Sequence, residues 1–103
     1  MAKVIFSISY EVSEDKRDEY LNLAKELKSL LKADGLESYE LYELKGKKNH
    51  FNELYTFGSE EAFEQFDDDQ NERINILINR LSELTSDTKY TTMIQVLESV
   101  PAA

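Results

Sequence analysis

The stretch that decides the fold is Phe51–Phe66, FNELYTFGSEEAFEQF, in which an alternating pattern changes to a helical one at Gly58. One side of the predicted strand carries Phe51, Glu53, Tyr55 and Phe57. Gly58 breaks the strand, and Ser59 is a good N-cap for a helix. Two glutamates follow in the first turn, where the helix dipole favours negative charge. The stretch therefore predicts a strand, a short turn and a helix.

Working outward, the chain predicts six elements in the order strand, helix, strand, strand, helix, strand. Their approximate ranges are Lys3–Val12, Asp15–Lys32, Leu36–Lys45, Asn49–Phe57, Ser59–Leu84 and Lys89–Ser99, with the second helical region interrupted at Asp67–Asp69 and resuming at Gln70. This βαββαβ order predicts an α+β, ferredoxin-like fold with a four-stranded antiparallel sheet. Two helices can cover only one face of such a sheet. Residues 1–103 are expected to form a single domain.

Composition excludes several classes of function. The net charge of -9 argues against nucleic acid and against an anionic membrane surface, which both need clustered Lys and Arg. Because the chain contains no cysteine, disulfides, thiol nucleophiles and thiolate metal sites are excluded. No stretch reaches the ~20 apolar residues of a membrane span, and the N-terminal run is too short for a signal peptide. We expect a cytoplasmic protein without a metal or cofactor.

The predicted hairpin sets the pairing of its two strands. Lys45–Lys48 suits a two-residue type II′ turn with Gly46 at its first central position. Counting back pairs Tyr42 with Phe51, Glu40 with Glu53 and Ser38 with Tyr55. Two carboxylates ~5 Å apart repel by about 3 kcal/mol at an effective dielectric of 20. Glu40 and Glu53 are therefore expected on the wet, uncovered face of the sheet.

The same register places four aromatic side chains on that uncovered face: Tyr42, Phe51, Tyr55 and Phe57. Their combined area is larger than a typical monomer leaves exposed in one patch. A second copy of the chain that covers the aromatics and leaves a small polar cavity satisfies both demands. The sequence therefore predicts a homodimer through the open sheet face.

A strand ending in Glu-x-aromatic, a short turn and then Ser-Glu-Glu-Ala-Phe resembles the antibiotic biosynthesis monooxygenase (ABM) family of the dimeric ferredoxin-like α+β barrel superfamily. The matching residues are Glu53, Tyr55, Ser59, Ala62 and Phe63. The resemblance implies two sheets stacked as a dimeric barrel, with a pocket between the sheet and helices of each subunit. It also implies oxygenation of quinol-like substrates without a cofactor. Where many members have a histidine in the following helix, this chain has Gln65 and Phe66, and it has no tryptophan for haem degradation.

Each candidate residue has a functional and a structural interpretation. Glu53 and Glu40 form a catalytic acid–base pair or are solvated charges at a rim. Tyr42, Tyr55 and Phe51 bind an aromatic ligand or pack at the subunit interface. Ser7 and Ser9 line the pocket if their face is inward, but they lack a histidine base to act as nucleophiles. His50, the only histidine, is expected to be a surface residue.

Two functions remain open. The chain is an ABM-like monooxygenase acting on an aromatic or quinone-like molecule without metal, or it is a non-catalytic barrel that binds a small molecule.

Overall fold

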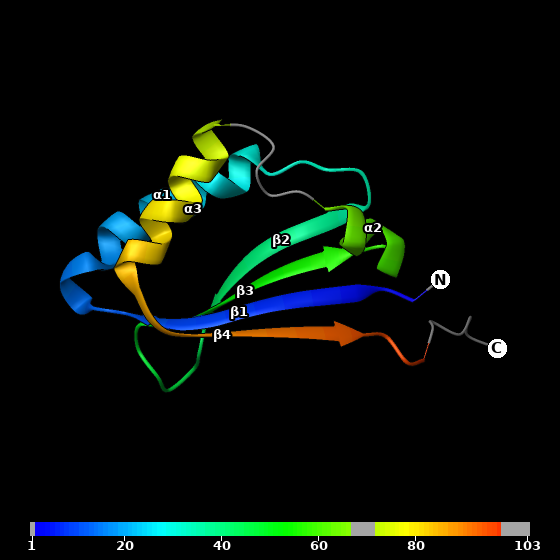
Figure 1. The fold of residues 1–103 in the computed structure, drawn as a ribbon. Coiled ribbons are helices and arrows are strands. Elements are labelled where there is room, and N and C mark those ends of the chain that lie inside the picture. Colours follow the sequence, from blue (N-terminus) through cyan, green and yellow to red (C-terminus); the bar gives the residue numbers. More distant parts are fainter. Residues whose placement is uncertain (1, 67–71, 98–103) are drawn as a thin grey trace.

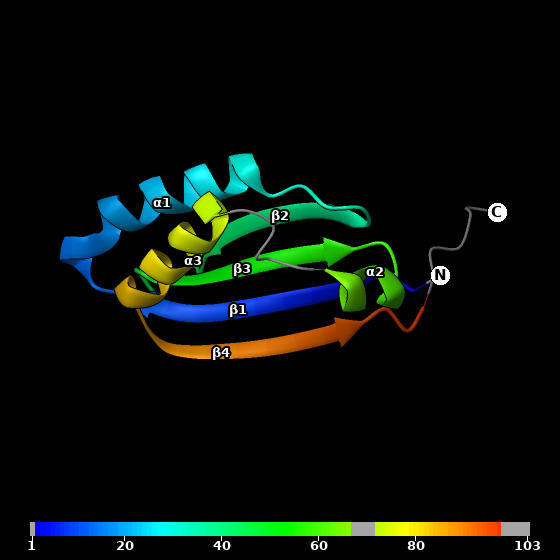
Figure 2. The same ribbon diagram turned by 45° about the horizontal axis from the view of Figure 1, so that its top comes forward.

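Two helices lie across one face of a four-stranded antiparallel sheet, as Figures 1 and 2 show. The computed structural model describes residues 2–66 and 72–97. The strand order is β2-β3-β1-β4, which with the βαββαβ element order confirms the predicted ferredoxin-like fold. The elements are β1 (Val4–Val12), a 3₁₀ turn η1 (Glu14–Lys16), α1 (Arg17–Leu30), β2 (Leu36–Glu43), β3 (His50–Phe57), α2 (Glu60–Gln65), α3 (Glu72–Leu84) and β4 (Thr85–Ile94). The predicted aspartate interruption and the helix start at Gln70 lie outside the described residues, as do the last two residues of the predicted final strand.

The central strand β1 behaves as its alternating sequence predicts. Val4, Tyr10 and Val12 are buried on the face that α1 and α3 cover. On β3, Phe57 lies opposite Val4, and Phe51 lies opposite Tyr10. Apolar side chains at every second position therefore give the sheet one dry face.

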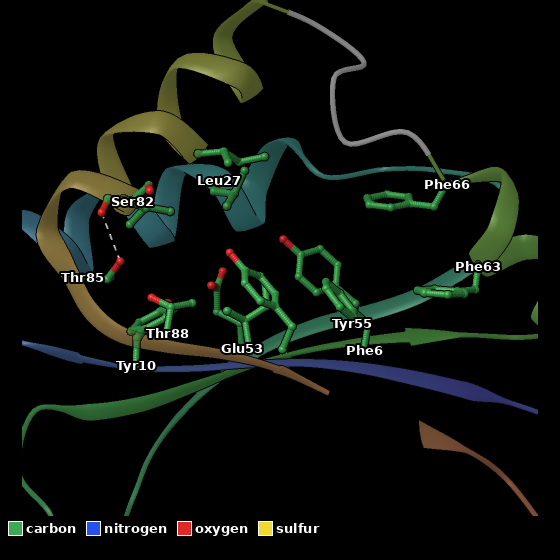
Figure 3. A pocket seen from close by; sticks show the side chains of 14 residues that line it. Phe6, Tyr10, Leu27, Glu53, Tyr55, Phe63, Phe66, Ser82, Thr85 and Thr88 are labelled. Carbon is green, nitrogen blue, oxygen red and sulfur yellow. Dashed lines mark hydrogen bonds between the residues drawn. The ribbon is translucent and has the colours of Figure 1, made fainter. Parts of the chain in front are cut away.

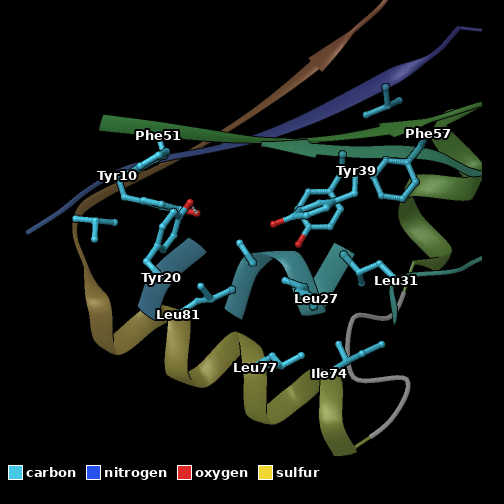
Figure 4. Close-up of a cluster of buried hydrophobic side chains, with 14 residues drawn as sticks. Tyr10, Tyr20, Leu27, Leu31, Tyr39, Phe51, Phe57, Ile74, Leu77 and Leu81 are labelled. Atoms are coloured by element: carbon cyan, nitrogen blue, oxygen red, sulfur yellow. Dashed lines mark hydrogen bonds between the residues drawn. The ribbon is translucent and has the colours of Figure 1, made fainter. Parts of the chain in front are cut away.

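The core lies between this face and the two long helices (Figure 4). Tyr20 and Leu27 of α1 and Leu77 of α3 are fully buried there. Where the helices face solvent, ion pairs join them, with Arg73 and Arg80 of α3 bonded to glutamates of α1 at 2.6 and 2.8 Å. The helices are thus held against each other as well as against the sheet.

The β2–β3 hairpin differs from the predicted two-residue turn. Residues 44–49 separate the strands, and both Gly46 and Asn49 have positive φ, at 87° and 68°. Backbone hydrogen bonds close this longer turn, including one of 2.9 Å from the Leu44 N–H to the His50 carbonyl. The predicted turn ended at Lys48 and did not include Asn49. The observed connection is longer because it extends to Asn49, a second residue with positive φ.

A polar cluster fixes the turn, and we call it the hairpin clamp: Glu14, Arg17, Glu43 and Asn49. Arg17 donates to both carboxylate oxygens of Glu43, at 2.6 and 3.0 Å, and to Asn49 Oδ1 at 2.8 Å. Asn49 donates its backbone N–H to Glu43 at 2.8 Å and its side-chain amide to Glu14. The clamp therefore ties the hairpin to the start of α1.

The clamp and the longer turn move the strand pairing by one residue. The observed pairs are Tyr39–Tyr55, Leu41–Glu53 and Glu43–Phe51. The prediction placed Ser38, Glu40 and Tyr42 in those three positions and is wrong. Because side chains alternate along a strand, Ser38, Glu40 and Tyr42 therefore point to the face opposite that of their predicted β3 partners.

The expected exposure of the β3 aromatics is also wrong. Phe51, Tyr55 and Phe57 are 2%, 4% and 0% exposed, and they pack beneath the helices rather than on the open face. The expectation assumed that Glu53 needs water. Tyrosine hydroxyl groups meet that need instead, so the whole β3 face can be dry.

Two local features place α2 close to the start of β2. Ser59 caps the helix, its side chain accepting a hydrogen bond of 3.1 Å from the Ala62 N–H, as predicted. Gly35, with φ of 84°, lies so close that an added Cβ would be 2.3 Å from Ala62 Cβ. Gly35 also accepts a 2.9 Å hydrogen bond from the Gly58 N–H. The chain therefore crosses itself tightly where α2 begins.

The edge strand β4 begins at Thr85, earlier than predicted, directly after α3. Asp87 takes a positive φ of 54° near an irregularity in the pairing with β1, and it lies within the strand although it precedes the predicted strand start at Lys89. Tyr90, Met93 and Ile94 of β4 are 68%, 47% and 51% exposed. No helix among residues 2–66 and 72–97 is long and apolar enough to cross a membrane.

Candidate functional site

A cavity of about 360 Å³ lies between the sheet and the helices (Figure 3). Its walls are mainly aromatic and aliphatic, with a few hydroxyl groups and one carboxyl group. The lining residues are Phe6, Ile8, Tyr10, Leu27, Glu53, Tyr55, Phe63, Phe66, Ile78, Leu81, Ser82, Thr85, Thr88 and Tyr90. The resemblance implied a pocket between sheet and helices, and this cavity lies in that position.

Aromatic rings form one end of the cavity. Phe6 on β1 is at the centre of this group, with the rings of Tyr55 and Phe63 both 5.9 Å away between centroids. Tyr90 of β4 stacks on Phe6 at 6.1 Å with an interplanar angle of 12°. Phe66 lies 5.8 Å from Tyr55 and completes the group. Flat, apolar walls of this kind suit a planar ligand.

Glu53 is the single ionisable carboxyl group of the lining. It lies on β3 between Phe51 and Tyr55, and it is only 5% exposed. The Tyr39 hydroxyl donates a hydrogen bond to its Oε1. Burial raises the pKa of Glu53, and hydrogen bonds from Tyr39 and Tyr10 oppose that rise. Glu53 is therefore a carboxyl group with a raised proton affinity on the wall of an aromatic cavity.

The tyrosines around Glu53 form a connected group. The hydroxyl groups of Tyr10 and Tyr20 are 2.6 Å apart, and both are buried. Burial is the main cause that raises the pKa of Tyr10, Tyr20 and Tyr39 above the usual value, and the nearby Glu53 carboxylate adds to the rise. These three hydroxyl groups stay protonated at neutral pH, so they can act as hydrogen-bond donors. We call Glu53, Tyr10, Tyr20 and Tyr39 the tyrosine–carboxyl cluster.

Two of the predicted site residues lie in the cavity wall. Glu53 and Tyr55 line it, as Figure 3 shows. Phe51 lies nearby but packs against the ring of Tyr20 at 4.7 Å, with the Arg17 guanidinium 5.4 Å from its ring centre. Phe51 therefore supports the cavity from the core and does not line it.

The other predicted site residues lie elsewhere. Tyr42 is 54% exposed, and Glu40 forms an ion pair with Lys28 of α1. Ser7 and Ser9 lie on the β1 face opposite that of Phe6 and Tyr10, because side chains alternate along the strand. Ser9 borders a second hollow, near His50 and Lys89.

The expected carboxylate pair is absent. Leu41, not Glu40, lies opposite Glu53, and Lys28 holds Glu40 on the outside of the edge strand β2. The raised pKa of Glu53 therefore comes from burial and not from a second carboxylate.

Sequence reasoning did not assign a role to Tyr10, Tyr20 or Tyr39. Tyr10 and Tyr20 occupy apolar positions of a strand and a helix, a pattern that by itself predicts only packing. The signal available was a hydroxyl group at each of those positions, because a buried tyrosine usually needs a hydrogen-bond partner. The predicted register placed Tyr39 on the face opposite to that of Glu53, whereas the observed register brings the two onto the same face.

No group of three or more His, Cys, Asp or Glu residues that could hold a metal ion occurs among residues 2–66 and 72–97. None of the described residues that line the cavity is Lys, Arg or His. A ligand in this cavity would therefore meet aromatic rings, hydroxyl groups and one carboxyl group.

The family model described as antibiotic biosynthesis monooxygenase matches residues 1–70. The chain belongs to the antibiotic biosynthesis monooxygenase family. The resemblance based on Glu53, Tyr55 and the Ser59 helix start is thus confirmed. No curated protein matches the chain.

Solved structures share the fold of this ABM protein. A conserved protein from Methanosarcina mazei Go1 has 21% identity and a TM-score of 0.77, over 92% of this chain and 94% of that one. SnoaB, a cofactor-independent oxygenase from Streptomyces nogalater, has 13% identity and a TM-score of 0.74, over 97% and 98%. Rv0793 from Mycobacterium tuberculosis has 16% identity and a TM-score of 0.68, over 97% and 99%. At these identities the likeness shows the fold alone.

Proposed function

We propose that this ABM-family protein is a cofactor-independent oxygenase of a planar, electron-rich aromatic molecule, with Glu53 as the group that accepts a proton from it. The observation that carries the proposal is the burial of one carboxyl group, without a neighbouring cation in the lining, on the wall of an aromatic cavity. A base with a raised pKa removes protons more effectively than an ordinary surface carboxylate.

The chemistry balances with molecular oxygen as the second reactant. The substrate class is a hydroxyaromatic compound with an acidic ring CH₂ group. Glu53 takes one proton from that carbon, and the resulting carbanion gives electrons to O₂. Overall the CH₂ group becomes a carbonyl, O₂ is reduced, and one oxygen atom leaves as water with the two hydrogens. The protein then has to bind the ring, accept a proton and exclude bulk water.

Several features of the cavity support these tasks. The rings of Phe6, Tyr55 and Phe63 can hold an aromatic plane by stacking and edge contacts. The hydroxyl groups of Ser82 and Thr88, on the other side of the cavity, can bond to polar ring substituents. SnoaB, whose fold this chain shares, is described as a cofactor-independent oxygenase.

A second function, ligand binding without turnover, is favoured by α2. Gln65 stands where many family members carry a histidine, and its amide is directed to Glu61 at 3.5 Å. Phe66 packs on Phe57 at 5.2 Å between ring centres and offers no proton-transfer group. The proposed oxygenase must therefore work with Glu53 alone, whereas a binding protein needs only the aromatic walls.

We also propose a homodimer through the open sheet face and β4. Of the four aromatic residues first used to argue for it, Phe51, Tyr55 and Phe57 are buried within one chain, and Tyr42 is exposed. The support now comes from Tyr42 and from other exposed apolar residues, Tyr90, Met93, Ile94, Val96 and Leu97. Light scattering should give twice the 12.0 kDa chain mass. A 12.0 kDa species at micromolar concentration would contradict the dimer.

The experiment for the oxygenase uses 1,8-dihydroxyanthrone as the probe and an oxygen electrode as the readout. We expect uptake of O₂ with the probe, and a loss of at least about 100-fold in kcat/KM for Glu53→Gln. The matched control is Glu40→Gln, which removes a carboxylate outside the cavity and should leave the rate unchanged.

The outcomes separate the two functions. Binding of the probe by both the parent protein and Glu53→Gln, without O₂ uptake, would reject the oxygenase and favour the binding protein. O₂ uptake that does not depend on Glu53 would reject Glu53 as the base.

A further inference from the structure

The tyrosine–carboxyl cluster extends from the cavity into the core. Glu53 and Tyr10 line the cavity, whereas Tyr20 does not and is 0% exposed. Tyr20 comes from α1, which packs on this face of the sheet, and its hydroxyl group lies 2.6 Å from that of Tyr10 (Figure 4). A residue that cannot touch a ligand is therefore connected to the carboxyl group that can.

The protonation state of Glu53 decides which hydroxyl group donates to which along this chain. Tyr10 of β1 and Glu53 of β3 lie diagonally across two paired strands, since Ile8 lies opposite Glu53 and Tyr10 lies opposite Phe51, and both line the cavity. Tyr10 has one proton and two neighbouring oxygen groups, the Tyr20 hydroxyl at 2.6 Å and the Glu53 carboxyl. When Glu53 is ionised, its carboxylate is the stronger acceptor, so Tyr10 donates to Glu53 and Tyr20 donates to Tyr10. When Glu53 is protonated, Tyr10 is free to donate to Tyr20 instead. The ionised form is thus stabilised by two successive donors along this branch.

Donation in series makes each hydrogen bond stronger than it would be alone. A hydroxyl group that accepts a hydrogen bond becomes a better donor, and this cooperative gain is larger in a site of low dielectric. Tyr20 therefore strengthens the bond from Tyr10 to Glu53 without contacting Glu53.

The position of Tyr20 is fixed on several sides. Its ring meets Tyr10 edge-on at 5.7 Å and lies 4.7 Å from the ring of Phe51. Arg17 covers Phe51, with its guanidinium carbon 5.4 Å from the ring centre. Since the Tyr20 side chain is fully buried, its hydroxyl group cannot turn to solvent.

Other titratable groups around Glu53 do not replace this effect. Tyr39 of β2 donates directly to Glu53, while Tyr55 of β3 and Tyr90 of β4 line the same cavity. The part of α3 that lines the cavity contributes Ile78, Leu81 and Ser82, none of which titrates at ordinary pH. Among the described residues that line the cavity, Glu53 is the only carboxylic acid, and there is no Lys, Arg or His.

We propose that Tyr20 is a positioning residue, which acts through Tyr10 to set the proton affinity of Glu53 from α1. The proposal rests on the proposed function only in giving Glu53 a role in proton transfer. Without Tyr20, Glu53 would bind its proton more tightly and a smaller fraction would be ionised at neutral pH. The helix would thus control the pH range in which the cavity contains a working base.

The test is a direct titration of Glu53 in the ligand-free protein by ¹³C-carboxyl NMR, with the Glu53 signal assigned by its loss in Glu53→Gln. Tyr20→Phe removes one oxygen atom and keeps the ring. We expect it to raise the Glu53 pKa by about 0.3 unit or more through lost cooperativity. Tyr39→Phe removes a direct donor and should raise it by about one unit or more.

Two further variants keep the test decisive. Tyr42→Phe deletes a hydroxyl group on an exposed side chain and should leave the titration unchanged. If Tyr20→Phe does not fold, Tyr10→Phe interrupts the same branch and should raise the pKa by more than the 0.3 unit expected for Tyr20→Phe. A folded Tyr20→Phe protein whose Glu53 titrates as in the parent would overturn the proposal.

The pH profile of the anthrone reaction gives an independent readout. The midpoint of kcat/KM should move upward in Tyr20→Phe by the same amount as the NMR titration, while the plateau at high pH changes little. A merely structural role would lower the rate at every pH. Because the NMR titration uses no ligand, it can support the role of Tyr20 even if the probe is not oxygenated, so the two proposals fail separately.

Discussion

Two polar clusters lie on the helix-covered side of neighbouring strands. Each contains one glutamate, and the pKa values of the two glutamates are shifted in opposite directions. The hairpin clamp surrounds Glu43 with Arg17 and the Asn49 backbone N–H. The tyrosine–carboxyl cluster surrounds Glu53 with neutral hydroxyl groups. The clamp lies at the partly exposed end of the sheet, and the tyrosine–carboxyl cluster lies in a cavity. The difference is the presence of a cation.

The two pKa directions express this contrast. Arg17 and the Asn49 backbone hold the pKa of Glu43 at about 2, below its usual value of 4.5. Burial raises the pKa of Glu53 above the same value. Glu43 therefore adds stability above pH 4.5, and this contribution is lost as pH falls towards about 2. Glu53 has the opposite sign: it lowers stability above its raised pKa, and that cost disappears as pH falls.

A carboxylate paired with a cation is best suited to structure, because its charge is already satisfied. A buried carboxyl group that has only neutral donors keeps a high affinity for a proton. The hairpin clamp is therefore suited to fixing the strand register, whereas Glu53 is suited to exchanging a proton with a ligand.

The largest expected effect is on the clamp. Asn49→Ala should lower the free energy of unfolding by about 2–4 kcal/mol, because it removes two side-chain hydrogen bonds to charged groups and forces alanine into positive φ. Urea unfolding at pH 7 measures the change. Asn49→Gly is the matched control and should recover about 1 kcal/mol, since glycine tolerates that φ. A loss below about 0.5 kcal/mol, the usual size of a surface substitution's effect, would show that the clamp is not structural.

A smaller effect of opposite sign is expected at Glu53. Glu53→Gln should raise the free energy of unfolding at pH 7 by about 1 kcal/mol or more, because it removes a carboxylate whose burial is costly. The gain should shrink near pH 4, where the parent protein already holds its proton. Urea unfolding of both proteins at the two pH values, at equal protein concentration, measures this difference. Equal stability at pH 7 would mean that Glu53 is solvated and that the contrast with Glu43 is false.

The smallest effect is expected at Glu40. Glu40→Gln breaks an exposed ion pair with Lys28 and should change stability by less than about 0.5 kcal/mol. Its effect should add to that of Glu53→Gln in the double variant, since the two side chains are not paired across the strands. A coupling above about 0.5 kcal/mol would restore the carboxylate pair that the sequence predicted.

The sequence predicted the parts of the fold that depend on local patterns. The alternation of apolar residues from Val4 to Val12 located β1, and Ser59 located the start of α2. The position of Glu53 beside Tyr55 at the end of β3 pointed to the family and to a strand that lines the cavity.

The parts that failed depend on contacts between distant residues. The register depends on Asn49, whose positive φ is stabilised by Arg17 and Glu14, residues more than thirty positions away in sequence. A shift of one residue replaced Glu40 by Leu41 opposite Glu53 and brought the Tyr39 hydroxyl to the Glu53 carboxyl. The role of Tyr20 could not be read from its helical position, because a tyrosine in an apolar stripe has the same pattern whether or not its hydroxyl group meets a partner.

Gly35 has a consequence for the kinds of sequence that this fold can accept. Any side chain at this position would meet Ala62 at 2.3 Å and would also have to adopt a φ of 84°, so space and backbone conformation both exclude it. Exchange of Ala62 for glycine would relieve the first restriction but not the second. Because α2 can approach only where this side chain is missing, Phe63 reaches the ring of Phe6. The aromatic end of the cavity is thus shaped by a residue that does not line it, and variation of cavity size among related sequences should leave position 35 fixed.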